Sequence, residues 1–98
     1  MNDVDHSRSD ELCEMVNVVN KRGLHARAAA KFAQMASSFK AEVYVAKGDM
    51  RVEGRSIMGL MLLAAAKGSC LKICASGEEA AEVTCALGDL VRRGFDEE

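Results

Sequence analysis

A single histidine is followed closely by an arginine where a turn leads into a helix. His25 lies in the segment RGLHAR (22–27), directly before an alanine-rich stretch. The first backbone N–H groups of a helix have no partner within it, and together with the helix dipole they favour an anion. A neutral imidazole is a nucleophile towards phosphorus. The N–H groups of Ala26 and Arg27 and the Arg27 guanidinium would hold the resulting phosphate, so the segment indicates a phosphoryl site.

This pair also has a simpler interpretation, in which His25 only begins the helix among ordinary surface residues. A cation in the first turn opposes the helix dipole, however, and a bound anion would explain Arg27 there. The sequence has no Ser-His-Asp set, no carboxylate pair with acid–base spacing and no Walker-type loop, so it does not predict an enzyme of those classes. The other histidine, His6, stands in a polar segment and has no predicted role.

A second feature is an apolar helix predicted within SIMGLMLLAAA (56–66). A sheet can cover only one side of it, which would be filled by Leu60, Leu63 and Ala64. The other side would leave Ile57, Met58 and Met61 partly exposed. Exposed methionine-rich surface adapts to several partners, which favours a docking role for these three residues. The alternative is that neighbouring helices bury them.

Ser56 stands at the start of this helix and also has two interpretations. As the residue before the first helical turn, its hydroxyl would cap the helix, and that role alone accounts for it. A phosphate on Ser56 would instead add negative charge beside the apolar surface and hinder an acidic partner, which would make the position regulatory.

The elements that must position these residues follow from the alternation of apolar and polar residues. Strands are predicted at 12–19, 41–47, 50–54 and 70–75, and helices at 26–39, 56–66 and 76–94. Lys67 and Gly68 would close the second helix. The order β-α-β-β-α-β-α with half-buried strands favours an α+β fold, with an antiparallel or mixed sheet and the helices on one face.

Four cysteines raise the question of a disulfide or a metal. Cys70 and Cys74 lie on one predicted strand, and four strand residues span about 13 Å, which exceeds the roughly 7 Å limit for a bridge. Their equal parity puts both on one face, and we expect small core residues. Pairings with Cys13 or Cys85 stay open. A metal or redox protein acting through cysteines is a third, disfavoured hypothesis, and no metal site is predicted.

Composition limits the remaining possibilities. The chain has 98 residues, enough for one small domain, and a formal charge of -2, which argues against nucleic acid as the main partner. No apolar run approaches the roughly 18 residues of a membrane span, so no membrane insertion is expected. The polar start does not resemble a signal peptide, so the cytoplasm is the expected compartment. We expect a flexible tail at 1–11, a domain at 12–94 and an acidic tail at 95–98.

Two separated motifs together resemble one family. GLHAR (23–27) is similar to the phosphohistidine motif, and RSIMGLM (55–61) to the serine-site helix, of HPr, the phosphocarrier of the bacterial phosphoenolpyruvate-dependent sugar phosphotransferase system. The similarity covers about residues 12–94. It implies an open-faced β-sandwich with a four-stranded, mainly antiparallel sheet and three helices on one face. It also implies that His25 accepts a phosphoryl group on Nδ1 from enzyme I and passes it to a IIA domain, with Arg27 steadying the phosphate.

The same resemblance implies a stoichiometric carrier that is not an enzyme, needs no cofactor and works as a monomer. Ser56 would match the position modified by the HPr kinase/phosphorylase in lineages that have it, and Ile57, Met58 and Met61 would fall on the shared docking surface. Ala28 departs from the family, which usually has proline after the arginine. Alanine keeps the helix and restores a donor, so transfer is expected to survive with a changed rate.

The pathway branch is left open by a further similarity. Residues 94–98, and the LL and KG pairs at 62–63 and 67–68, are also similar to NPr, the paralogue of the nitrogen-related regulatory branch. The output could therefore be sugar uptake, regulation or both. The alternative function is a regulatory protein-binding module controlled at Ser56, with little transfer through His25.

Overall fold

The computed structural model describes residues 11–97; His6 and nearly all of the predicted amino-terminal tail lie outside these residues. In chain order the elements are β1 (Leu12–Asn17), α2 (Ala26–Ser37), β2 (Glu42–Lys47), β3 (Met50–Glu53), α3 (Ile57–Leu62), β4 (Cys70–Ser76), α4 (Ala80–Arg92) and the 3-10 turn η1 (Gly94–Asp96). This order confirms the predicted alternation of strands and helices. None of the helices within 11–97 has the length and apolar character needed to cross a membrane.

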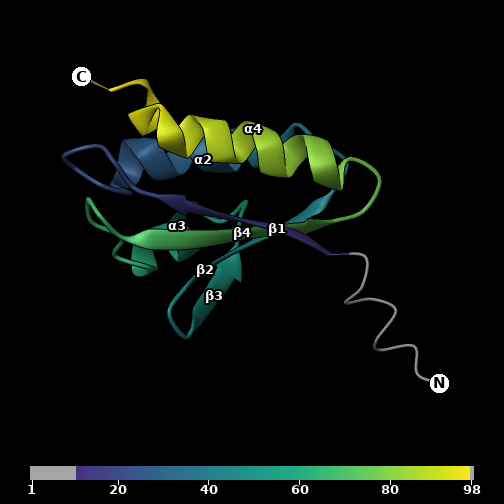
Figure 1. Cartoon of the computed structure of the whole chain (residues 1–98), viewed down its shortest axis with the longest axis horizontal. Helices are drawn as coiled ribbons and strands as arrows, with labels where there is room; N and C mark the ends of the chain where they lie inside the picture. The colour runs from purple at the N-terminus through teal and green to yellow at the C-terminus, as the bar shows by residue number, and fades with distance from the viewer. Residues whose placement is uncertain (1–10, 98) are drawn as a thin grey trace.

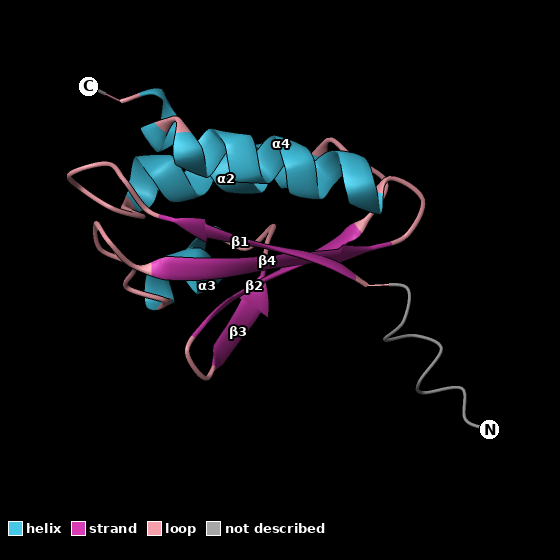
Figure 2. Cartoon of the chain, in the orientation of Figure 1, coloured by secondary structure: helices cyan, strands magenta, loops and turns pink. Residues whose placement is uncertain are grey.

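The four strands form one antiparallel sheet in the order β1-β4-β2-β3. Helices α2 and α4 lie side by side across one face of it (Figure 1, Figure 2). Val45 pairs with Ile73 on one side and Val52 on the other, so apolar residues line up across the sheet beneath the helices. The α+β fold with an open sheet face is confirmed.

The core is built from the predicted apolar faces of the helices and strands. Phe32 of α2 is fully buried, and so are its neighbours on that helical face, Ala29, Ala33 and Ala36. Leu60 and Leu63 bring the α3 segment into the same core. Each large apolar side chain buried in this way contributes about 1.5–3 kcal/mol to the stability of the fold.

The carboxyl-terminal segment differs from the prediction. Residues 95–98 were expected to form an acidic tail, but Phe95 is 0% exposed and joins the core. It adopts a left-handed conformation (φ 57°) within η1, and the Lys31 ammonium donates to its carbonyl at 2.8 Å. Burial of the ring turns the chain back onto the domain and fixes the place of the residues that follow.

Helix α3 ends earlier than predicted, at Leu62, although alanines continue to residue 66. The chain leaves the helix at Ala64, which has a φ of 50° and is exposed, so the prediction that it fills the core is wrong. Ala65 is buried instead, and its carbonyl accepts from the N–H of Leu24 at 2.9 Å. Lys47 Nζ donates to the carbonyl of Leu63 at 3.0 Å. These tertiary contacts outweigh the helical propensity of alanine.

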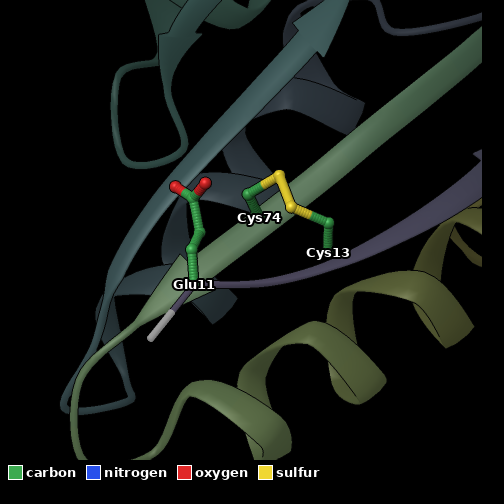
Figure 3. A group of neighbouring side chains, drawn as sticks. All are labelled: Glu11, Cys13 and Cys74. Atoms are coloured by element: carbon green, nitrogen blue, oxygen red, sulfur yellow. A yellow bond between two sulfur atoms is a disulfide. The ribbon is translucent and has the colours of Figure 1, made fainter. Parts of the chain in front are cut away.

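The cysteines agree with the prediction only in part, because Cys74 is buried, as expected, whereas Cys70 is exposed. Cys70 and Cys74 share one face of β4, but the buried core face belongs to Leu71, Ile73 and Ala75. Cys70 is exposed on the open face, and Cys74 forms a disulfide with Cys13, its direct partner across β1 and β4 (Figure 3). One of the pairings left open by the sequence is therefore formed. It joins the edge strand β1 covalently to the centre of the sheet.

Glu11 lies beside this disulfide (Figure 3). Its carboxylate pairs with Arg51 at 2.8 Å, and the two sulfurs are bonded to each other. A metal site of this type needs thiolates, and the bonded sulfurs offer none.

Candidate functional site

The loop that carries His25 is held against the segment after α3. Gly23 has a φ of +66°, and a Cβ on it would lie 2.4 Å from the carbonyl oxygen of Ala65. Only glycine can supply both this backbone conformation and this close approach. The Leu24 side chain is buried, and its N–H completes the contact with Ala65. The loop is thus fixed immediately before His25.

His25 is the residue directly before α2, as the sequence predicted. Its backbone is extended (φ −80°, ψ −178°), and its carbonyl accepts from the N–H of Ala29 at 2.8 Å. Its side chain makes no capping hydrogen bond to the helix. The N–H groups of the first turn, those of Ala26 and Arg27 among them, have no intrahelical acceptor and remain available for an anion.

The imidazole of His25 is directed to the carboxyl-terminal segment. Its Nε2 contacts Oε2 of Glu97, and the side chains of the pair are 14% and 18% exposed. Asn20 Nδ2 donates to the other carboxylate oxygen of Glu97 at 2.9 Å and also to the carbonyl of Gly23 at 2.9 Å. The sequence analysis missed Asn20 and Glu97. The available signal was Phe95, an aromatic residue too apolar for a solvated tail.

The surroundings of Glu97 favour its ionised form. The hydrogen bond from Asn20 is the largest cause that lowers the pKa of Glu97 below its ordinary value, and the hydrogen bond with His25 and the charge of Arg22 act in the same direction. Burial opposes this shift. A carboxylate is therefore maintained against one nitrogen of the imidazole.

Cationic side chains surround a hollow of about 360 Å³ beside this pair. Its lining residues are Lys21, Arg22, Arg27, Lys31, Asp96 and Glu97. The predicted residue Arg27 therefore shares a hollow with the partner of His25, together with three cations that the sequence analysis did not select. A second hollow of about 200 Å³ includes His25 itself, Arg22 and the backbone turn after α3. The four cations outnumber the two carboxylates of the first hollow, and together with the open helix start they suit a multiply charged anion such as a phosphoryl group.

The serine and methionine helix forms a separate feature. Ser56 Oγ accepts from the Gly59 N–H at 2.9 Å, so the predicted cap is formed. Ile57, Met58 and Met61 are 44%, 72% and 44% exposed, which agrees with their predicted exposure. Leu62, which the sequence analysis did not select, is 64% exposed on the same helix. Within residues 11–97, these four side chains leave a partly exposed apolar surface on α3.

Comparison with known proteins identifies the family. A family model described as "PTS HPr component phosphorylation site" matches residues 13–93. The phosphocarrier protein HPr of Neisseria meningitidis serogroup A is 52% identical over 86 residues, which cover 88% of this chain and 97% of that protein. The phosphocarrier protein NPr of Shewanella violacea is 37% identical over 87 residues, which cover 89% and 96%.

A solved structure of an HPr protein is also similar to this chain. The crystal structure of HPr-C-His from Thermoanaerobacter tengcongensis has a TM-score of 0.85 and 40% sequence identity, and the match covers 89% of this chain and 98% of that one. Proteins of this kind carry phosphoryl groups and are not catalytic enzymes. The chain belongs to the HPr family of phosphocarrier proteins of the phosphotransferase system.

Proposed function

We propose that His25 is the phosphoryl-accepting residue of this phosphocarrier, that enzyme I is its donor and that a IIA domain is its acceptor. The observation that carries the proposal is the position of His25 at a helix start with no side-chain cap, in contact with Glu97, which lines a hollow together with four cations and Asp96. The membership of the chain in a family of phosphocarriers supports the same role. The proposal assigns the exchange to the cytoplasm.

The proposed transfer uses only groups of the chain and its protein partners. The lone pair on Nδ1 of His25 forms a bond to phosphorus, while the bond from phosphorus to the donor breaks and its electron pair leaves with the donor. The N–H groups of Ala26 and Arg27 and the Arg27 guanidinium then bind the phosphoryl oxygens. On delivery the N–P bond breaks and its electron pair returns to Nδ1. Phosphoryl transfer needs mainly positioning and charge stabilisation, so no cofactor is required.

Partner docking is assigned to the exposed surface of α3. Ile57, Met58 and Met61 offer flexible apolar contacts there. A carrier must leave one partner before it reaches the next, so we expect small, short-lived interfaces. The same surface would serve donor and acceptor in turn, with the protein acting as a monomer.

The experiment that tests the carrier role measures mass. The protein is incubated with phosphoenolpyruvate, Mg²⁺ and enzyme I, and its intact mass is recorded before and after acid treatment. We expect one acid-labile phosphoryl addition that is absent in His25→Ala. The matched control is Glu82→Gln, an exposed position in the first turn of α4. If His25→Ala accepts the group at the rate of the original protein, the assignment is wrong.

A regulatory role at Ser56 is the second candidate function. Ser56 is partly exposed and begins the helix that carries Met58, so a phosphate there would lie beside the docking surface. An HPr kinase/phosphorylase would be the modifying partner. Pull-downs that compare protein with and without phosphate on Ser56 separate the two candidates, because binding that follows Ser56 and ignores His25 favours the regulatory module. Parallel transfer assays with IIA domains of the sugar and nitrogen-related branches would identify the branch.

A further inference from the structure

We propose that Glu97 is a positioning residue for phosphoryl transfer, which holds the proton of His25 on Nε2 and so keeps Nδ1 free as the nucleophile. The proposal rests on the assignment of His25 as the phosphoryl-accepting residue. It adds a residue that lies 72 positions away in the sequence and reaches the site only through the fold.

The geometry gives Glu97 a defined orientation. One carboxylate oxygen contacts His25 Nε2, and the other accepts from Asn20 Nδ2 at 2.9 Å. The Asn20 amide is itself oriented by its second hydrogen bond, to the carbonyl of Gly23 in the loop before His25. The buried ring of Phe95 fixes the chain two residues before Glu97. Figure 1 shows the carboxyl-terminal end on the same side of the molecule as the loop between β1 and α2.

The identity of the contacting nitrogen determines the tautomer. An ionised carboxylate accepts hydrogen bonds and cannot donate one, so the nitrogen facing it must carry a hydrogen. With the proton on Nε2, the neutral ring has its lone pair on Nδ1. The hydrogen bond from Asn20 lowers the pKa of Glu97 and so favours the ionised carboxylate. This carboxylate is the acceptor that the Nε2–H tautomer needs.

The same contact acts in both directions of transfer. When Nδ1 forms its bond to phosphorus, the ring gains positive charge while its Nε2 hydrogen stays in place, and the Glu97 carboxylate balances that charge. When the N–P bond breaks, its electron pair returns to Nδ1, and the leaving group is a neutral imidazole that still bears the Nε2 hydrogen. No proton has to enter or leave at Nε2 in either step.

Replacement of Glu97 by glutamine is a sharp test because the shape is kept. Glutamine offers one acceptor oxygen to two donors, Asn20 Nδ2 and His25 Nε2, so one of them must face an NH₂ group. Glu97→Ala removes both hydrogen bonds and serves as a second variant. Glu82→Gln makes the same chemical change at the start of α4, far from η1 along that helix, and is the matched control.

The first readout is the tautomer of His25, which needs no donor protein. ¹⁵N chemical shifts of labelled histidine distinguish a protonated ring nitrogen from one with a free lone pair. We expect the neutral ring to be predominantly Nε2–H in the original protein and in Glu82→Gln, and the Nδ1–H form to increase in Glu97→Gln. Equal tautomer populations in the original protein and in both Glu97 variants would overturn the proposal.

The second readout is the rate of phosphorylation with two donors. Loss of one charge-assisted hydrogen bond to the reacting ring is expected to slow acceptance about tenfold in Glu97→Gln. The decrease should be the same with enzyme I and with phosphoramidate, a small donor that makes no docking contacts. A decrease seen only with enzyme I would assign Glu97 to docking and overturn the positioning role. If enzyme I fails to phosphorylate the original protein while the tautomer result holds, the carrier proposal fails and the role of Glu97 in orienting His25 stands.

Discussion

The two helix starts that bear the predicted functional residues differ in how their N–H groups are used. Before α3, the hydroxyl of Ser56 accepts from the N–H of Gly59 at 2.9 Å. Before α2, the side chain of His25 accepts from no helix N–H and contacts Glu97 instead. The backbone is extended at both residues, so the difference arises from the side chains and their partners.

This difference distinguishes a capped helix start from the one to which we assign the phosphoryl site. At the start of α3, the N–H of Gly59 has an acceptor in the Ser56 hydroxyl. The residues that follow Ser56, Ile57 and Met58, are apolar and exposed. At α2 the requirement for an acceptor is left open, and Arg27 adds a cation to the first turn, where it opposes the helix dipole. An open helix start with a cation in its first turn can accommodate an anion, whereas a capped start followed by apolar residues suits contact with a protein.

The largest expected effect tests this separation through phosphoryl acceptance. His25→Ala should abolish the acid-labile mass increase, because the nucleophile is removed. Ser56→Ala should still accept one phosphoryl group, since the hydroxyl caps α3 and takes no part in the transfer. Intact-mass measurements after incubation with enzyme I and phosphoenolpyruvate check both variants. A loss of acceptance in Ser56→Ala with the fold intact would contradict the division of roles.

The sequence predicted both helix starts correctly, because nearby residues determine where these helices begin. The positions of His25 and Ser56 directly before helices follow from turn residues and apolar spacing, and both agree with the structure. The same holds for Phe32, whose place in an i, i+3, i+4 pattern predicts burial. Such patterns are contained within a few turns of the chain.

The features that the sequence did not predict depend on contacts between segments that are distant in the chain. Helix α3 ends where Ala65 meets Leu24, the face of Cys74 is set by its neighbours Ile73 and Ala75, and Glu97 reaches His25 only because Phe95 is buried. Local propensity favoured a longer helix, and strand parity could relate the cysteines to each other without identifying the face that the helices cover. Sequence reasoning therefore located the histidine and missed the carboxylate beside it.

The next largest expected effect is the loss of stability when the side-chain cap of α3 is removed. Ser56→Ala removes the acceptor for the Gly59 N–H and should lower the free energy of unfolding by about 1 kcal/mol. Ser56→Thr keeps a hydroxyl at the same position and should recover most of that loss. Urea denaturation followed by circular dichroism measures both. No change in Ser56→Ala would mean that the cap contributes nothing to the stability of the domain.

Acid should loosen the start of α2 and leave the start of α3 unchanged. The pKa of Glu97 is lowered mainly by the hydrogen bond from Asn20, with His25 and Arg22 acting in the same direction, and the pKa of Asp96 is lowered mainly by its hydrogen bond with Arg93. A carboxyl group with a lowered pKa in the folded state stabilises the fold above its ordinary pKa. This stabilisation is lost as the pH falls through the folded value.

We therefore expect the turn η1 and the start of α2 to loosen below about pH 4.5, the ordinary value for a glutamate, while the hydroxyl cap of α3 does not titrate. Amide exchange is measured at Ala29, whose N–H bonds to the carbonyl of His25, and at Gly59, whose N–H bonds to Ser56. The comparison runs between pH 6 and 3 and is corrected for the intrinsic exchange rate. Glu97→Gln should remove part of the pH dependence at Ala29. Equal loosening at both helix starts would instead indicate a general acid transition.

The smallest expected effect is that of proline at Ala28, the third residue of α2. Ala28 stands where the family usually has proline, and Ala29 is the residue whose N–H reaches the carbonyl of His25, so Ala28→Pro removes no bond within α2. Ala28 is fully buried, however, and the added ring must find space, which offsets the gain from a stiffer unfolded chain. We expect a change in the free energy of unfolding below about 1 kcal/mol and in the rate of phosphoryl acceptance below about threefold.

Gly59 is the corresponding residue of α3, but its N–H is the one that Ser56 accepts. Gly59→Pro removes that N–H, and a Cβ at this position would lie 3.1 Å from Ser56 Oγ and 3.2 Å from Val52 Cβ. It should therefore destabilise the protein by more than Ser56→Ala alone. Thermal denaturation of the two proline variants compares the helix starts directly. A loss as large in Ala28→Pro as in Gly59→Pro would contradict the expectation that the Ala28 N–H has no partner in the folded protein.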